Sequence, residues 1–126
     1  MDKQRILDAV REICLALPEA SERPSHGEPT FFVGGKRSFA TVWDNHHADG
    51  RYALICAAPP GMQATFIEAD RERFFVPPYF GPRGWIGVRL DGAFDRDEIT
   101  GIVEDAYAEV APPKLVEAAG RRREAD

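Results

Sequence analysis

Residues 30–43 read TFFVGGKRSFATVW, and this stretch decides the fold. Two runs rich in aromatic and β-branched residues flank a pair of glycines, a pattern typical of two antiparallel strands joined by a tight turn. Glycine reaches the positive φ angles that two-residue hairpin turns require. We therefore expect strands over residues 30–33 and 37–43, joined by a two-residue turn at Gly34 and Gly35.

The chain after this hairpin continues the sheet. Residues 44–50 are rich in Asp, Asn and Gly and predict a second turn, which leads into a third strand over 51–57. Two prolines and a glycine then break the sheet, and a short helix is expected over 62–69. Two more strands follow, a short edge strand at 74–76 and a stronger one at 85–90.

Two longer helices flank the predicted sheet. Residues 2–17 place apolar side chains at helical spacing along one stripe, and Pro18 ends this helix because proline breaks the hydrogen-bond pattern. A polar loop is expected over 19–29. Nearer the C-terminus, Asp95 is placed to cap a second amphipathic helix over 95–110. The apolar stripe of that helix consists of Ile99, Ile102, Val103, Ala106, Tyr107 and Val110.

The length of the chain leaves room for one domain. It has 126 residues, of which 44% are hydrophobic, and this fits a single core. We expect an α+β fold in which N-terminal and C-terminal helices pack on an antiparallel sheet. The domain is expected to span residues 1–118, followed by a frayed tail at 119–126, because Gly120 and three consecutive arginines favour solvent.

Charge is unevenly distributed along the chain. The formal net charge is −5, which argues against a strongly basic nucleic-acid-binding protein. Residues 31–90, however, carry seven basic and five acidic side chains, so one surface of the sheet region is expected to be mildly basic. No apolar run approaches the roughly 20 residues that cross a bilayer, and the N-terminus lacks the apolar stretch of a signal peptide. We therefore expect a cytoplasmic protein with no membrane partner.

The residue types that carry most enzyme chemistry are not arranged for catalysis. Cys14 and Cys56 lie in apolar segments, which predicts two core residues rather than a disulfide, a metal pair or a nucleophile. His46 and His47 could bind a divalent metal together with neighbouring aspartates, but adjacent histidines point apart, and a solvated turn is the favoured interpretation. The sequence predicts no enzyme, no catalytic residue, no metal site and no cofactor.

Two features could recognise a ligand. Lys36 and Arg37 stand beside the predicted hairpin tip, where they could contact phosphate oxygens or simply keep the tip hydrated. The sheet region is also rich in aromatic side chains, which could stack on bases or line a ligand cleft, although core packing is the commoner role. We expect Trp85 in particular to be buried. These aromatic residues are Phe31, Phe32, Phe39, Trp43, Tyr52, Phe74, Phe75, Tyr79, Phe80 and Trp85.

Several short motifs occur in an order that resembles a known family. They are LPEA at 17–20, SHGEPTF at 25–31, GK at 35–36 before FA at 39–40, YFGPRGWIGV at 79–88 and LD at 90–91. Over nearly its whole length the chain resembles the MmcQ/YjbR family of small bacterial proteins. The resemblance implies an α+β domain with two projecting hairpins, a double-wing architecture associated with DNA binding, and it brings no enzymatic residues.

The resemblance assigns nucleic-acid contacts to the two hairpin turns, with Lys36 and Arg37 in the first turn and Arg51 in the second. We therefore predict a DNA-binding or regulatory accessory domain that acts through basic hairpin tips. The alternative is a protein-interaction or small-ligand-binding module that uses the aromatic-rich sheet face and the loop at 77–84. A broad DNA-binding surface would require the basic residues of the sheet region to converge on one face. These are Lys36, Arg37, Arg51, Arg71, Arg73, Arg83 and Arg89.

Overall fold

A computed structural model describes residues 1–46 and 48–125, with side chains described as far as residue 121. The strands are β1 (Ala20–Ser25), β2 (Glu28–Val33), β3 (Arg37–Asp44), β4 (Tyr52–Cys56), β5 (Phe74–Phe75) and β6 (Ile86–Arg89). The helices are α1 (Lys3–Leu15), α2 (Met62–Ala69), α3 (Arg96–Val110) and α4 (Pro113–Ala125), with a 3-10 turn, η1 (Gly81–Arg83). The strands expected at 51–57, 74–76 and 85–90 are thus present with slightly shorter bounds.

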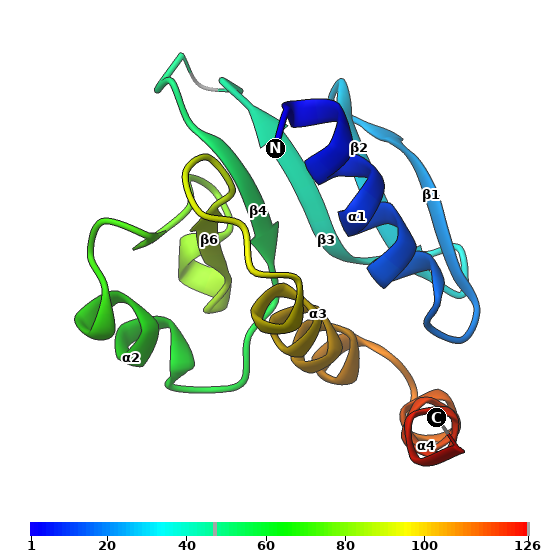
Figure 1. Ribbon diagram of the computed structural model, residues 1–126. Coiled ribbons are helices and arrows are strands. Elements are labelled where there is room, and N and C mark those ends of the chain that lie inside the picture. Colours follow the sequence, from blue (N-terminus) through cyan, green and yellow to red (C-terminus); the bar gives the residue numbers. More distant parts are fainter. Residues whose placement is uncertain (47, 126) are drawn as a thin grey trace.

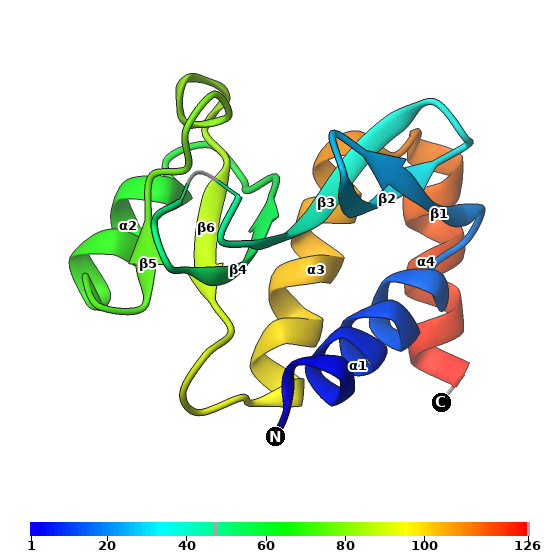
Figure 2. The same cartoon turned by 90° about the horizontal axis from the view of Figure 1, so that it is seen from above.

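The strands form one antiparallel sheet in the order β1-β2-β3-β4-β6-β5. Helices α1 and α3 lie side by side against one face of this sheet, α2 lies near β5, and α4 follows α3 (Figures 1 and 2). The loop between β5 and β6 rises on the other side of the sheet, away from α1 and α3 (Figure 2). The predicted α+β fold with helices packed on an antiparallel sheet is confirmed.

The core lies between the sheet and the two long helices. All six residues of the predicted apolar stripe on α3 are buried. On α1 the stripe buries Ile6, Val10, Ile13 and Cys14. Trp85 is only 4% exposed, as expected for the residue that begins the last strand. No helix in the described part of the chain is long and apolar enough to cross a membrane.

The N-terminus of α3 is capped as the sequence predicts. The Oδ1 atom of Asp95 accepts hydrogen bonds from the backbone N–H groups of Asp97 at 3.0 Å and Glu98 at 3.3 Å. The Glu98 side chain forms an ion pair with Arg73 in the turn before β5. This ion pair therefore joins the N-terminal end of α3 to the segment just before the edge strand β5, a long-range contact that the local sequence does not reveal.

Strand β1 lies within the segment that was predicted to be a loop, and that prediction was wrong. Its six residues pair with β2 from Ala20↔Val33 to Ser25↔Glu28. Strand β1 is at the edge of the sheet, and none of its residues is fully buried. An edge strand of this kind does not need alternating apolar residues, so its sequence, ASERPS, carries no strand signal.

The turn between β2 and β3 is longer than the predicted two residues. Val33 pairs with Arg37, which leaves Gly34, Gly35 and Lys36 in the turn. Both glycines have positive φ angles, +63° and +73°, as expected. Lys36 is therefore part of the turn itself. Further along the ladder, a register shift at Phe31 and Phe32 leaves Phe39 of β3 without a partner on β2, which is a β-bulge.

Helix α4 occupies the region where at most one helical turn followed by a frayed tail was predicted. Pro113 stands at its first position, where proline is tolerated because the missing N–H would have no helical partner. Alanine, glutamate and arginine favour helix strongly enough to outweigh the cost of about 1 kcal/mol for Gly120. Leu115 and Ala119 pack against the core. A domain boundary at residue 118 stays a prediction.

Candidate functional site

The face of the sheet opposite α1 and α3 is hollowed into a cleft of about 610 Å³. The cleft lies between the β1–β2 turn, strands β2 and β3, and the loop at 77–84. It is lined by Ser25, His26, Thr30, Ser38, Thr41, Trp43, His46, Tyr79, Phe80 and Arg83. These residues come from segments that are far apart in the sequence, and the sheet order brings them together.

The floor of the cleft carries a pair of buried hydroxyl groups. Thr30 on β2 and Thr41 on β3 are directly opposite each other in the antiparallel ladder, and their hydroxyl oxygens are 2.9 Å apart. The Thr41 hydroxyl lies 2.9 Å from the carbonyl oxygen of Pro29, and the Thr30 hydroxyl lies 3.0 Å from that of Glu28. Backbone geometry therefore fixes both side chains, so the polar floor exists before any ligand binds.

A row of aromatic rings, which we call the aromatic wall, consists of His46, Trp43 and Phe80, which line the cleft, and of Trp85, which stacks on Phe80. His46 stacks on Trp43 with ring centroids 4.7 Å apart, and Phe80 stacks on Trp85 at 4.5 Å. The Trp43 and Phe80 rings join the two pairs at 6.0 Å. The wall connects β3 with the β5–β6 loop, and it places flat apolar surface beside the hydroxyl floor.

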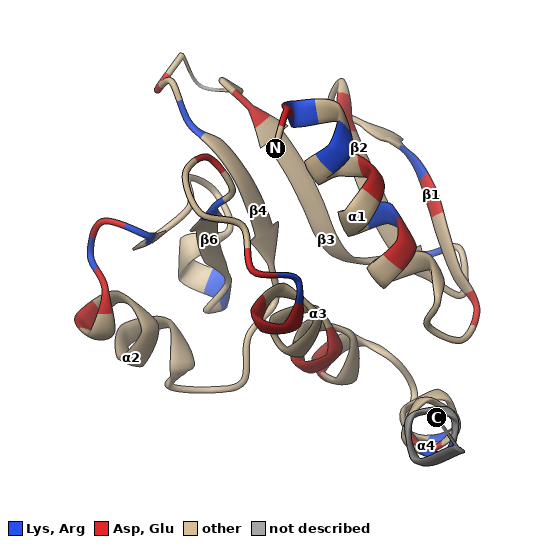
Figure 3. Ribbon diagram, in the orientation of Figure 1, with Lys and Arg blue, Asp and Glu red and all other residues tan. Residues whose placement is uncertain are grey.

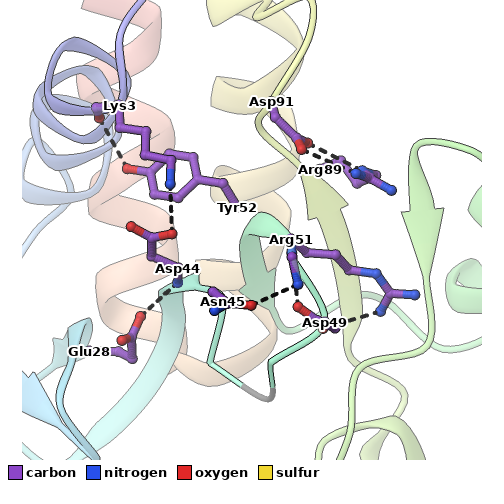
Figure 4. A network of polar contacts seen from close by, with 10 residues as sticks. Lys3, Glu28, Asp44, Asn45, Asp49, Arg51, Tyr52, Arg89 and Asp91 are labelled. Carbon is purple, nitrogen blue, oxygen red and sulfur yellow. Dashed lines mark hydrogen bonds and ion pairs between the residues drawn. The ribbon is translucent and has the colours of Figure 1, made fainter.

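His46 lies in the turn between β3 and β4, as the sequence predicts, but its side chain is partly buried rather than fully solvated. Its side chain is 22% exposed, and Nδ1 is 3.9 Å from Oε1 of Glu28. Oε2 of Glu28 accepts a hydrogen bond from the backbone N–H of Asp44, and Oδ1 of Asp44 accepts one from Nζ of Lys3 (Figure 4). This chain of contacts fixes the start of the β3–β4 turn. His47 lies outside the described residues.

A metal centre is not formed by the described residues, which include no group of three or more His, Cys, Asp or Glu side chains that could hold an ion. Cys14 and Cys56 are buried and free, as predicted. Burial raises the pKa of the Cys14 thiol well above its usual value, and it raises the pKa of Cys56 to about 12. Both thiols stay protonated at neutral pH, so neither acts as a nucleophile.

The loop at 77–84 is held rigidly over the sheet. The Nε2 atom of Gln63 on α2 donates to the carbonyl oxygens of Gly81 at 2.9 Å and Trp85 at 2.7 Å. Four backbone hydrogen bonds lie within the loop. A Cβ atom at Gly81 would meet Cγ1 of Val76 at 2.5 Å, so a larger residue there would require Val76 to move.

Arg83 at the end of this loop supplies a cation to the cleft. Its guanidinium lies 4.9 Å from the ring centre of Trp85 and 5.5 Å from that of Phe80. The side chain is exposed, and within the described part of the chain it forms no ion pair. Arg83 also lines a neighbouring cavity of about 440 Å³, together with Arg37 and Glu109.

Two residues on opposite rims of the cleft have left-handed backbones that normally favour glycine. His26 in the β1–β2 turn has φ +52°, and Tyr79 in the β5–β6 loop has φ +67°. Such conformations cost on the order of 1–3 kcal/mol for residues with a side chain. The Tyr79 side chain is nevertheless 81% exposed.

The residues predicted to contact nucleic acid lie at two opposite ends of the sheet. Lys36 and Arg37 are exposed at the β2–β3 turn, and Arg51 follows the β3–β4 turn. The eight residues of β3 lie between these turns, which corresponds to about 25 Å at the usual rise of a strand. Figure 1 shows the two turns at opposite ends of β3. Nη1 of Arg51 is 3.7 Å from Oδ2 of Asp49, and its guanidinium stacks 3.9 Å over the ring of Phe75 (Figure 4). The structure does not bring the three cations together.

The other basic residues of the sheet region do not form one basic face. Arg73 pairs with Glu98, and Arg89 pairs with Asp91. The hydrogen bond from Arg89 lowers the pKa of the Asp91 carboxyl below its usual value, so this acid stays ionised beside its partner. Figure 3 shows basic and acidic residues alternating along α1, while α3 is mainly acidic.

Sequence reasoning identified part of the cleft and missed the rest. The aromatic-rich sheet face and the loop at 77–84 were predicted as a possible ligand site, and both line the cleft. Ser25 and His26 were placed in a loop because β1 was missed. Gln63 carried no signal, since a single glutamine on a short helix has no pattern that marks it as the support of a distant loop.

The fold and the cleft define a class of protein: a small α+β domain with two helices on one face of an antiparallel sheet and a polar, aromatic cleft on the other. A sequence profile of the YjbR family matches residues 15–109, and the chain belongs to this family. A crystal structure of the Deinococcus radiodurans protein DR2400, with a DUF419 domain, is similar in fold, with a TM-score of 0.70. At 20% identity the similarity covers 92% of this chain and 86% of that one. A search of curated proteins finds no match.

Proposed function

We propose that this chain is a small-ligand-binding domain that performs no catalysis of its own. The observation that carries this proposal is the cleft on the open face of the sheet, where hydroxyl groups, aromatic rings and the cation of Arg83 converge. Its volume of about 610 Å³ falls within the roughly 300–1,000 Å³ that ligand pockets occupy. Of the two functions that the sequence left open, the geometry therefore favours ligand binding at the aromatic-rich sheet face.

The rigidity of the cleft supports a binding role. The threonine floor is fixed by the β2–β3 register, and the loop at 77–84 is fixed by Gln63. A site that is already ordered loses little conformational entropy when it binds, so more of the contact energy appears as affinity. A binding role also fits the buried, protonated state of Cys14 and Cys56, which leaves them unsuited to nucleophilic chemistry.

DNA binding at the β2–β3 turn is the second candidate function. Lys36 and Arg37 favour it because both are exposed and form no ion pair with any described residue. Two cations neutralise few phosphates, however, and the formal net charge of −5 opposes approach to a polyanion. Any such binding would be weak and would decrease steeply with salt.

One experiment compares the two candidates. Amide and indole N–H signals of the ¹⁵N-labelled protein are followed while a set of small aromatic and aliphatic fragments, or a 12-base-pair duplex, is added. The two tryptophans provide indole reporters in the aromatic wall. We expect fragments to shift the indole signal of Trp43 and the amide of Thr41. If fragments leave these signals unchanged while the duplex shifts Gly35, Lys36 and Arg37, DNA binding replaces the proposal.

A further inference from the structure

We propose that the ligand of the cleft is a planar aromatic molecule with a single anionic group, a carboxylate or a phosphate. In this arrangement the anionic group pairs with Arg83, and the ring lies against the aromatic wall beside Tyr79. This inference rests on the proposed function, and it adds the chemical class of the ligand. It concerns a free small molecule and not the end of a nucleic-acid strand.

The anionic group is inferred from the state of Arg83. The guanidinium carbon lies 4.9 Å from the ring centre of Trp85 and 5.5 Å from that of Phe80, which are cation–π distances. No described carboxylate forms an ion pair with this guanidinium, whereas Arg51, Arg73 and Arg89 are each paired with an acid. A guanidinium that is positioned but not neutralised is a binding group for a carboxylate or phosphate.

A ligand with a single anionic group fits the cleft better than a polyphosphate does. The neighbouring cavity, which shares Arg83, contains Arg37 but also Glu109, so the acid offsets one of its two cations. On the other side of the cleft, Glu28 is near His46 and accepts from the backbone of Asp44. The described residues that line the cleft include one arginine, Arg83, and no lysine, so they match a ligand with one anionic group better than one with several.

The aromatic part of the ligand is inferred from the rings that line the cleft. Trp43 and Phe80 present a wall that is already ordered by stacking. Tyr79, also from the loop at 77–84, lines the same cleft and adds a third ring. Planar rings stack favourably on such side chains, and the threonine hydroxyls, which donate to backbone carbonyls, can accept hydrogen bonds from ring substituents.

Three probes separate the contribution of the aromatic ring to affinity from the contribution of the negative charge. They are 2-naphthoate, which has both features, 2-naphthylmethanol, which has the ring alone, and cyclohexanecarboxylate, which has the charge alone. Dissociation constants are measured from amide shifts at constant ionic strength. We expect 2-naphthoate to bind at least tenfold more tightly than either of the others, because only it engages both the wall and Arg83.

Variants at two positions, Arg83 and Tyr79, assign these contributions to residues. Arg83→Gln should weaken 2-naphthoate about tenfold and leave 2-naphthylmethanol unchanged, while Arg83→Lys should recover part of the loss. Arg71→Gln is the matched control, since Arg71 is exposed and lines neither cavity. Tyr79→Ala should weaken both naphthyl probes to the same extent and leave cyclohexanecarboxylate unchanged. Arg83 and Tyr79 are exposed, so thermal unfolding of these variants should match that of the native protein.

The failures of the two proposals are distinguishable. If fragments shift the cleft signals but 2-naphthoate binds no more tightly than 2-naphthylmethanol, the anionic ligand is wrong and the binding function stands. If no probe or fragment affects the cleft, both are wrong. A single-stranded thymidine oligonucleotide that binds more tightly than 2-naphthoate, and loses this affinity in Arg83→Gln, would replace the free small molecule by nucleic acid.

Discussion

The two faces of the sheet are built by alternate residues of the same strands, yet they differ in chemistry. On β3, Ala40 and Val42 face the helices and are buried among apolar side chains, while Thr41 and Trp43 face the cleft. The helix-covered face is closed by α1 and α3, whereas the other face carries the threonine hydroxyls and the exposed cation of Arg83 at the cleft. The first face forms the core, and the second is the one for which we propose a binding role.

The largest expected effect is on the helix-covered face. Phe39 is fully buried and contacts Tyr107 of α3 edge-to-face at 5.5 Å. Phe39→Ala should lower the free energy of unfolding by about 3–5 kcal/mol, because it removes core contacts and leaves a cavity. Tyr79→Ala on the cleft side should change it by less than about 0.5 kcal/mol. Urea denaturation measures both, and equal losses would contradict the division of roles between the faces.

A smaller effect is expected for the support of the cleft loop. Gln63→Ala removes two hydrogen bonds and leaves the carbonyls of Gly81 and Trp85 without their side-chain donor. We expect a loss of about 1–3 kcal/mol and faster amide hydrogen exchange in the loop. Gln4→Ala is the control, since Gln4 bonds only to the exposed side chain of Asp8. Unchanged exchange in Gln63→Ala would show that the loop does not depend on this residue.

The smallest of the three effects on the free energy of unfolding concerns α3, one of the two helices on the helix-covered face. Asp95→Ala should lower the free energy of unfolding by about 1 kcal/mol, because two backbone N–H groups of α3 lose their acceptor. Asp95→Asn should retain most of the stability, since asparagine also caps helices. A denaturation midpoint that does not change in Asp95→Ala would remove the capping assignment.

The sequence predicted the helix-covered face better than the cleft, and the reason is physical. Burial against a helix or a sheet imposes a period on apolar residues, and this period identified every buried residue of the stripe on α3. The edge strand β1 has no such period, because its side chains are not required to fill a core. The extra turn residue Lys36 follows from the pairing of Val33 with Arg37, which a local pattern cannot reveal.

The cleft itself results from tertiary structure. Aromatic residues and the loop at 77–84 could be recognised in the sequence as possible ligand contacts. Their meeting with His26 and Thr30, however, depends on the order of the strands. The position of His46 depends on stacking with Trp43, which a solvated turn would not have. Residue types can therefore suggest a site, while only the fold determines which of them share it.

The most direct test of the central claim compares two N–H signals in one titration with 2-naphthoate. The indole N–H of Trp43 reports on the cleft, and the backbone N–H of Lys36 reports on the β2–β3 turn. The account predicts a saturable shift of the Trp43 signal that weakens about tenfold in Arg83→Gln, with no shift of Lys36 at the same concentrations. A shift of Lys36 without one at Trp43, or a Trp43 shift that is unaffected by Arg83→Gln, would contradict it.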